Sequence, residues 1–133
     1  MFVDTSALVA ILTEEVEGEV LSARLEAARH PFTSPIAVYE AALAIRRKRQ
    51  RPMATIRADL AAFLKAAGIR LVAVPPAAAD PALDAFARYG KGTGHPAQLN
   101  MGDCFAYAMA VIHDAPLLFK GDDFALTDIA ARE

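Results

Sequence analysis

Short apolar segments alternate with longer segments of helical character along almost the whole chain. The apolar segments are residues 1–4, 32–33, 69–74 and 117–119. Between them, apolar residues recur every three or four positions, as they do in amphipathic helices. This alternation predicts strands joined by helical crossovers, and therefore an α/β sandwich whose helices cover both faces of a small, mainly parallel central sheet.

Helix boundaries follow from capping and breaking residues. We expect helices over 7–12, 14–29, 34–49, 54–67, 77–89 and 100–113, a loop over 90–99 and a turn over 121–123. Thr5 or Ser6 is the expected cap of the first helix. Val16 and Val20 stand at helical spacing in the second. Pro35 lies in the first turn of the third, where its missing N–H costs nothing.

Composition limits the class of protein. The chain has 133 residues, the size of one domain, and its 55% apolar and 23% charged residues exclude a disordered chain. Its net charge of −2 means that any polyanion is met by a local basic patch. The single cysteine excludes an internal disulfide, no basic segment precedes the first apolar stretch, and no apolar run reaches the ~18 residues of a membrane span. We therefore expect a cytoplasmic protein with no membrane partner.

Three carboxylates stand alone in apolar surroundings. Asp4 is the only charged side chain in residues 1–12, Glu40 in residues 36–45 and Asp103 in residues 100–112. Neither Glu40 nor Asp103 has an oppositely charged side chain three or four positions away on its helix. A buried carboxylate without a partner is unfavourable by several kcal/mol or takes up a proton. Three such groups in separate elements indicate convergence on a cation.

The position and chemistry of these groups narrow the choice of cation. Asp4 and the pair Asp122–Asp123 each follow a predicted strand, at the sheet edge where α/β proteins bind ligands. Ligands that are all oxygen favour Mg²⁺ or Mn²⁺ over Zn²⁺. Such an ion assists the attack of water on a phosphodiester. The pattern therefore predicts metal-assisted phosphodiester hydrolysis.

Each carboxylate, taken alone, also has a purely structural explanation. Asp4 could cap the helix that follows it, and Asp103 could be a helix N-cap. Glu40 could pair with an arginine or extend to solvent. Asp122 and Asp123 are ordinary residues in a turn. These explanations are individually open, but all of them must hold at once to remove the cluster.

Four segments of the sequence resemble the PIN-domain ribonucleases, and among these the VapC toxins of bacterial toxin–antitoxin pairs. The segments are VDTSAL, SPIAVYEAALAIRR, LNMGDCFAYAMA and PLLFKGDDFALTDI. The resemblance extends over nearly the whole chain and implies a single PIN domain over residues 1–133 with a PIN-like α/β/α sandwich. It also implies a Mg²⁺- or Mn²⁺-dependent endoribonuclease with a cytoplasmic site of action.

The resemblance also implies which residues form the site. The family's acidic cluster falls on Asp4, Glu40, Asp103 and Asp122, with Asp4 and Asp103 closest to the metal and Glu40 orienting metal or water. Many PIN domains place the fourth acid where Gly121 stands here, so Asp123 is an alternative to Asp122. A hydroxyl of Thr5 or Ser6 would support the site. The implied partners are an RNA substrate of the tRNA or rRNA type, a VapB-type antitoxin and a second copy of the chain.

Basic residues gather in one segment, IRRKRQR, at the end of the third predicted helix. They are Arg46, Arg47, Lys48, Arg49 and Arg51. One interpretation is a solvated helix end that complements the macrodipole. The other is a contact with RNA phosphates. The loop YGKGTGHP adds Lys91 and His95, which either guide RNA or belong to a plain loop.

Two other functions compete with RNA cleavage. One is a different Mg²⁺-dependent phosphohydrolase, although an enzyme with an aspartyl nucleophile at Asp4 would place a second Asp where Ser6 stands. The other is a catalytically silent PIN module that binds RNA or protein. Cys104 follows Asp103 directly, and we expect an inert buried thiol because no spacing identifies a paired histidine. Metal-dependent RNA cleavage distinguishes the first function from the others.

Overall fold

A four-stranded parallel sheet forms the centre of the molecule. A computed structural model describes residues 1–132. The strands are β1 (Phe2–Val3), β2 (Phe32–Thr33), β3 (Arg70–Leu71) and β4 (Leu117–Leu118), in the spatial order β3-β2-β1-β4. Every neighbouring pair is parallel, and Phe2 lies opposite both Phe32 and Leu117. The predicted α/β sandwich with a mainly parallel sheet is confirmed.

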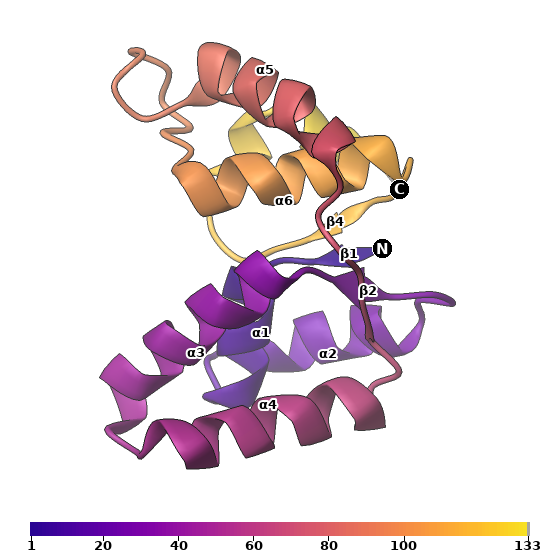
Figure 1. Ribbon diagram of the computed structural model, residues 1–133, viewed down its shortest axis with the longest axis vertical. Coiled ribbons are helices and arrows are strands. Elements are labelled where there is room, and N and C mark those ends of the chain that lie inside the picture. The colour runs from indigo at the N-terminus through magenta and orange to yellow at the C-terminus, as the bar shows by residue number, and fades with distance from the viewer. Residues whose placement is uncertain (133) are drawn as a thin grey trace.

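Helices cover both faces of the sheet. They are α1 (Thr5–Leu12), α2 (Gly18–Glu26), α3 (Pro35–Arg49), α4 (Met53–Ala66), α5 (Ala79–Tyr89) and α6 (Met101–Ile112), with short 3₁₀ turns at Pro76–Ala78, Phe124–Leu126 and Asp128–Ala131. Figure 1 shows α5 and α6 above the sheet and α1 to α4 below it. None of the helices among residues 1–132 has the length and apolar composition to span a membrane.

The two faces of the sheet belong to two separate hydrophobic cores. Phe2 packs into the core of α5 and α6, whereas the next residue, Val3, packs into the core of α1 to α4. Leu117 and Leu118 divide in the same way. Adjacent strand residues point to opposite faces, so a strand covered on both sides is apolar throughout. This accounts for the short continuous apolar segments in the sequence.

The prediction of one helix over 14–29 is wrong at its start. The helix α2 begins only at Gly18, because the chain turns after α1 with Glu14 at a positive φ of 55°. Val16 lies in this turn and is 94% exposed, and Val20 is 65% exposed on α2. Val16 thus precedes the helix, Val20 lies on its outer side, and the face of α2 that packs inward is that of Leu21 and Leu25.

The segment 69–74 forms a much shorter strand than its composition predicts. Only Arg70–Leu71 pairs, and it pairs with β2 alone. As the edge strand it has one neighbour, and Leu71 is 57% exposed. Apolar composition therefore overstated both the length and the burial of this strand.

The helix caps also differ from prediction. Asp4, and not Thr5 or Ser6, caps α1: its Oδ2 accepts the backbone N–H of Ser6 at 3.0 Å. Asn100 caps α6 and accepts the N–H of Asp103 at 2.9 Å, while Asp103 Oδ2 accepts the N–H of Asn100 at 3.0 Å. This reciprocal pair is a capping box. Asp4 therefore has the capping role considered for it, whereas Asp103 is the partner of the cap.

Candidate active site

Asp4 is a fixed, desolvated carboxylate at the end of β1. It is 4% exposed, and its Oδ2 accepts the Ser6 hydroxyl at 2.6 Å in addition to the Ser6 N–H. Burial raises the pKa of Asp4, the hydrogen bonds from Ser6 oppose that rise, and the nearby charge of Glu40 adds to it. A capping role accounts for one oxygen, but burial still disfavours the anionic form of the carboxylate.

Thr5 and Ser6 support two different acids. Ser6 Oγ donates to Asp4 and accepts the backbone N–H of Lys120 at 2.9 Å, which ties the chain after β4 to Asp4. Thr5 Oγ1 is 3.0 Å from the Ala37 carbonyl oxygen and 3.4 Å from Glu40 Oε1. The hydroxyl pair therefore links α1 to both α3 and β4 at the carboxyl end of the sheet.

Glu40 reaches from α3 to the start of α6. Burial raises its pKa, the charge of Asp103 raises it further, and the Thr5 hydroxyl lowers it. The carboxylate lies against the Cα of Gly102, and a Cβ at residue 102 would overlap its three terminal atoms. Glycine at this position therefore lets the Glu40 carboxylate lie against α6.

Asp103 is a partly buried carboxylate in the first turn of α6. Burial raises its pKa from 3.8 to about 6, and the charges of Asp4 and Asp123 contribute, while the hydrogen bond from Asn100 opposes the rise. Asp4, Glu40, Asp103 and Asp123 are thus joined by mutual repulsion, and we call them the acid cluster.

The two candidates for the fourth acid point to different surroundings. Asp123 acts electrostatically on Asp103, as stated above. Asp122 instead lines a hollow on the α2 side, together with Glu17, Val20 and Lys120. Both residues are exposed. The choice between them remains a prediction, and the electrostatic coupling favours Asp123.

The acid cluster fits a hard divalent cation in its donor chemistry. All of its members are carboxylates, which Mg²⁺ and Mn²⁺ prefer. Among residues 1–132, no three His, Cys, Asp or Glu side chains lie close enough together to hold an ion by themselves. Mg²⁺ in phosphate-handling sites is commonly held by one or two carboxylates and completed by water and substrate phosphates. Asp4 and Asp103, whose charges act on one another, could supply two such carboxylates.

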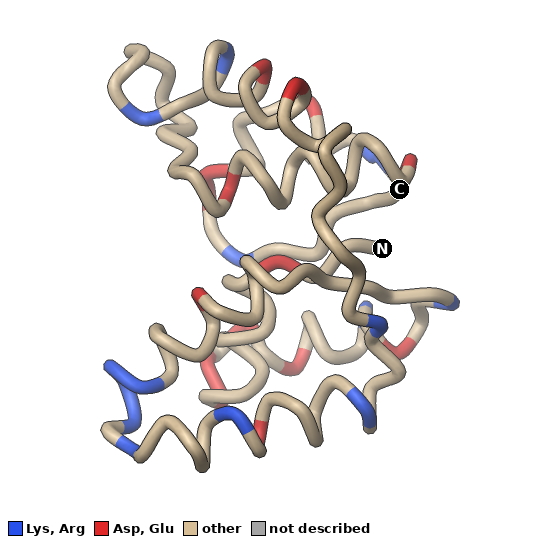
Figure 2. The backbone as a smooth tube through the Cα atoms, in the orientation of Figure 1, with Lys and Arg blue, Asp and Glu red and all other residues tan. Residues whose placement is uncertain are grey.

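The basic segment divides into residues that the protein uses internally and residues that it leaves exposed. Lys48 Nζ contacts Glu15 Oε2 at 2.8 Å and Thr13 Oγ1 at 2.9 Å, and Arg49 donates to the Thr13 carbonyl at 2.7 Å. These contacts fasten the end of α3 to the turn after α1. Figure 2 shows the basic positions gathered where α3 turns toward α4. There a hollow of about 750 Å³ is lined by Arg46, Arg47, Gln50, Arg51, Pro52 and Met53.

Lys91 lies apart from the acid cluster and from the basic segment. It borders an apolar hollow between α5 and α6, whose lining includes Leu83, Phe86 and Met101. Leu83 and Met101 are largely exposed, and Phe86 is about half exposed. Lys91 therefore stands beside an apolar surface, and its contact with RNA stays a prediction.

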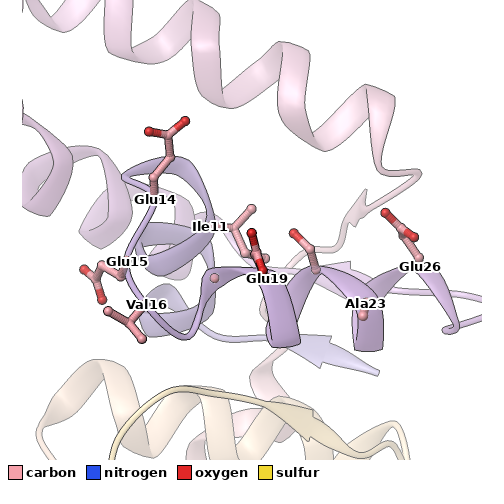
Figure 3. Close-up of a pocket in the computed structure, with 9 residues that line it drawn as sticks. Ile11, Glu14, Glu15, Val16, Glu19, Ala23 and Glu26 are labelled. Atoms are coloured by element: carbon pink, nitrogen blue, oxygen red, sulfur yellow. The ribbon is translucent and has the colours of Figure 1, made fainter.

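A separate acidic hollow of about 700 Å³ lies between α1 and α2. Figure 3 shows Glu14, Glu15, Glu19 and Glu26 around it. Glu15 is engaged by Lys48 and Lys120, and these two lysines lower its pKa. The hollow shares no residue with the acid cluster, and we do not assign it to the active site.

Sequence reasoning missed three supporting residues. Asn100 stands three residues before Asp103, a spacing that resembles a capping box and could have been recognised. Gly102 is a glycine within a helical pattern, which often marks a close approach. Lys120 gives no local signal, because its backbone contact with Ser6 depends on how β4 is placed beside β1.

Known proteins are similar to this chain over nearly its full length. The PIN domain family model matches residues 1–130. A ribonuclease VapC from Mycolicibacterium smegmatis is 44% identical over 131 residues, covering 98% of each chain. Ribonuclease VapC30 from Mycobacterium tuberculosis is 45% identical over 130 residues, covering 98% of this chain and 96% of its own.

Solved structures give the same answer for the fold. The crystal structure of Mycobacterium tuberculosis VapC20, described as a Sarcin-Ricin loop cleaving toxin, aligns with a TM-score of 0.72. It covers 99% of this chain and 98% of its own, at 18% identity. The chain therefore belongs to the PIN domain family and, within that family, to the VapC ribonucleases.

Proposed function

We propose that the protein is a metal-dependent endoribonuclease toxin that hydrolyses RNA phosphodiester bonds at the acid cluster. The observation that carries the proposal is the mutual repulsion of carboxylates from β1, α3, α6 and the segment after β4, of which Asp103 has a pKa of about 6. Groups with such perturbed pKa values gather at functional sites. The names of the relatives at 44–45% identity support ribonuclease activity.

Each residue of the site has its own role in the proposed reaction. Asp4 and Asp103 hold Mg²⁺ or Mn²⁺, which when bound acidifies water and offsets charge on the phosphate. Glu40 accepts a proton from the attacking water, since its raised pKa suits a general base better than that of an ordinary glutamate. Thr5 Oγ1 orients Glu40, and Ser6 orients Asp4. Asp123 adds negative charge from the segment after β4.

The proposal includes partners. The substrate is a tRNA or rRNA, and a cognate VapB-type antitoxin neutralises the toxin. Val16 and Val20 on the α2 side, and Leu83, Phe86 and Met101 near α5 and α6, are exposed apolar side chains suited to protein contacts, including a homodimer. A different metal-dependent phosphohydrolase and a silent binding module remain the competing functions.

Removal of the metal tests the proposed function directly. Purified protein is incubated with a mixture of structured RNAs in Mg²⁺, in Mn²⁺ and with a chelator, and the product ends are read. We expect cleavage only with metal, leaving a 5′-phosphate and a 3′-hydroxyl, because water is the nucleophile. Cleavage that persists in chelator and leaves 2′,3′-cyclic phosphates contradicts the mechanism. Metal binding without cleavage of any RNA favours the silent module.

A second experiment tests the role of Glu40 through its neighbour. Gly102→Ala should lower RNA cleavage by about 10- to 100-fold, because the added Cβ displaces the Glu40 carboxylate. Thermal stability should be unchanged or slightly higher, since alanine favours a helix more than glycine does. Cleavage rates and melting temperatures of the two proteins are compared.

The double variant provides the control. In a Glu40→Ala background the alanine at residue 102 has no carboxylate to displace, so Gly102→Ala should cause little further loss. Additive losses would show instead that Gly102→Ala acts on α6 itself.

A further inference from the structure

The exposed side of α3 carries one aromatic and two basic side chains, beginning next to Glu40 and extending toward the end of the helix. Tyr39 precedes Glu40 directly and is 65% exposed. Arg46 follows Tyr39 by seven residues and Arg47 follows Glu40 by seven, and both arginines are exposed. Seven residues are almost two helical turns, so each pair shares a face and is separated by about 10 Å along the axis. We call Tyr39, Arg46 and Arg47 the α3 track.

The two arginines of the α3 track are available to a ligand. Lys48 and Arg49 are held by Glu15 and Thr13, as described above. Among residues 1–132, by contrast, no carboxylate lies within ion-pair distance of Arg46 or Arg47. The protein has a net charge of −2, so a polyanion needs such a local patch to bind. Within the described part of the chain, both arginines are therefore positive charges without an acidic partner, on the helix that carries Glu40.

The packing of residues 1–132 does not account for the exposure of Tyr39. The inward side of α3 is formed by Ala37, Ala41, Ala42 and Ile45, all of them buried. A tyrosine on the opposite side leaves a large apolar ring in water. Exposed aromatic rings next to basic side chains are the usual platforms for unstacked nucleic-acid bases.

We propose that the α3 track binds a single-stranded segment of the RNA substrate, with Tyr39 stacking on a base beside the scissile phosphate and Arg46 and Arg47 binding phosphates farther along the strand. The proposal rests on the proposed function and names the form of RNA that it acts on. Bases within a duplex are covered by their neighbours, so Tyr39 requires a loop, bulge or end. The acid cluster then cuts next to the stacked base.

Binding measurements separate the two kinds of contact. Each variant is prepared in an Asp103→Asn background and titrated against a fluorescent single-stranded RNA of about 12 nucleotides at several salt concentrations. The double variant Arg46→Gln/Arg47→Gln should reduce the slope of log affinity against log salt by about 1.4, that is, about 0.7 for each lost phosphate contact. Tyr39→Leu should weaken binding by about 10-fold with the slope unchanged, and Tyr39→Phe should retain binding.

The controls make the result decisive. Arg70→Gln, on the edge strand β3, removes an exposed arginine outside the track and should leave the slope unchanged. Melting temperatures confirm that each variant is folded. Affinity and slope equal to the parent for both track variants would overturn the proposal and leave the face to a protein partner. Equal affinity for the corresponding duplex would overturn the assignment to single strands.

Cleavage in the otherwise unchanged protein distinguishes this proposal from the proposed function. If Asp103→Asn abolishes cleavage while the track variants cut at the parental rate, only the α3 track is wrong. If the parent cuts no RNA, the proposed function fails, and the binding titration still decides whether the track holds RNA.

Discussion

Replacing Asp103 with asparagine should lower RNA cleavage by at least about 100-fold and leave the fold intact. Loss of supporting residues around metal ligands typically costs 10- to 100-fold, so loss of a ligand itself should cost at least the upper value. The asparagine side-chain oxygen can still accept the backbone N–H of Asn100, so the start of α6 is preserved. Asp4→Asn should have a similar effect, and both are measured as cleavage rates in saturating Mg²⁺.

The matched control is Asp84→Asn, which removes an exposed carboxylate of α5 that is not among the charges acting on the pKa of Asp4, Glu40 or Asp103. It should cut like the parent. Parental cleavage by purified Asp103→Asn or Asp4→Asn would refute the site assignment, and equal loss in Asp84→Asn would point to a general effect of charge.

In metal-free protein, the same Asp103→Asn change should stabilise the fold near neutral pH. The pKa of Asp103 is raised from 3.8 to about 6, chiefly by burial. Protonation of Asp103 therefore contributes to the free energy of unfolding. This contribution is fully present below about pH 4 and is lost as the pH rises through about 6. The raised pKa corresponds to at most about 3 kcal/mol, and since the side chain is partly exposed we expect about 1–2 kcal/mol.

The measurement is the melting temperature in chelator at about pH 5 and about pH 7.5. The variant should exceed the parent by several degrees at the higher pH, where the parent carries an ionised Asp103, and by less at the lower pH. If the variant melts below the parent at both pH values, the hydrogen bond between Asp103 and Asn100 outweighs the unfavourable burial of the Asp103 charge.

Local patterns in the sequence predicted most of the fold and the central residues of the candidate site. Phe2 and Val3 belong to two cores, which is why the first strand is uniformly apolar, and that uniformity was readable. The isolation of Glu40 and Asp103 in apolar helices could also be predicted, because no basic residue lies three or four positions away from either of them.

Features that depend on contacts between distant parts of the chain could not be predicted from the sequence. Val16 and Leu21 are equally apolar, and only the path of the chain after α1 leaves one exposed and buries the other. The segment 69–74 reads as a core strand, yet its place at the sheet edge is set by pairing with β2 alone. Asp122 and Asp123 are adjacent, and only their surroundings give them different neighbours.

The division of the protein into two cores has a consequence for its activity. Asp4 and Glu40 are carried by elements packed on the lower core, whereas Asp103 begins a helix of the upper one. Ala37 of α3 also belongs to the upper core, so the spacing of these carboxylates is set by how the two layers pack on the sheet and against each other. Substitutions deep in either layer, at Met109 or at Ile56, can change catalysis without touching a single acid.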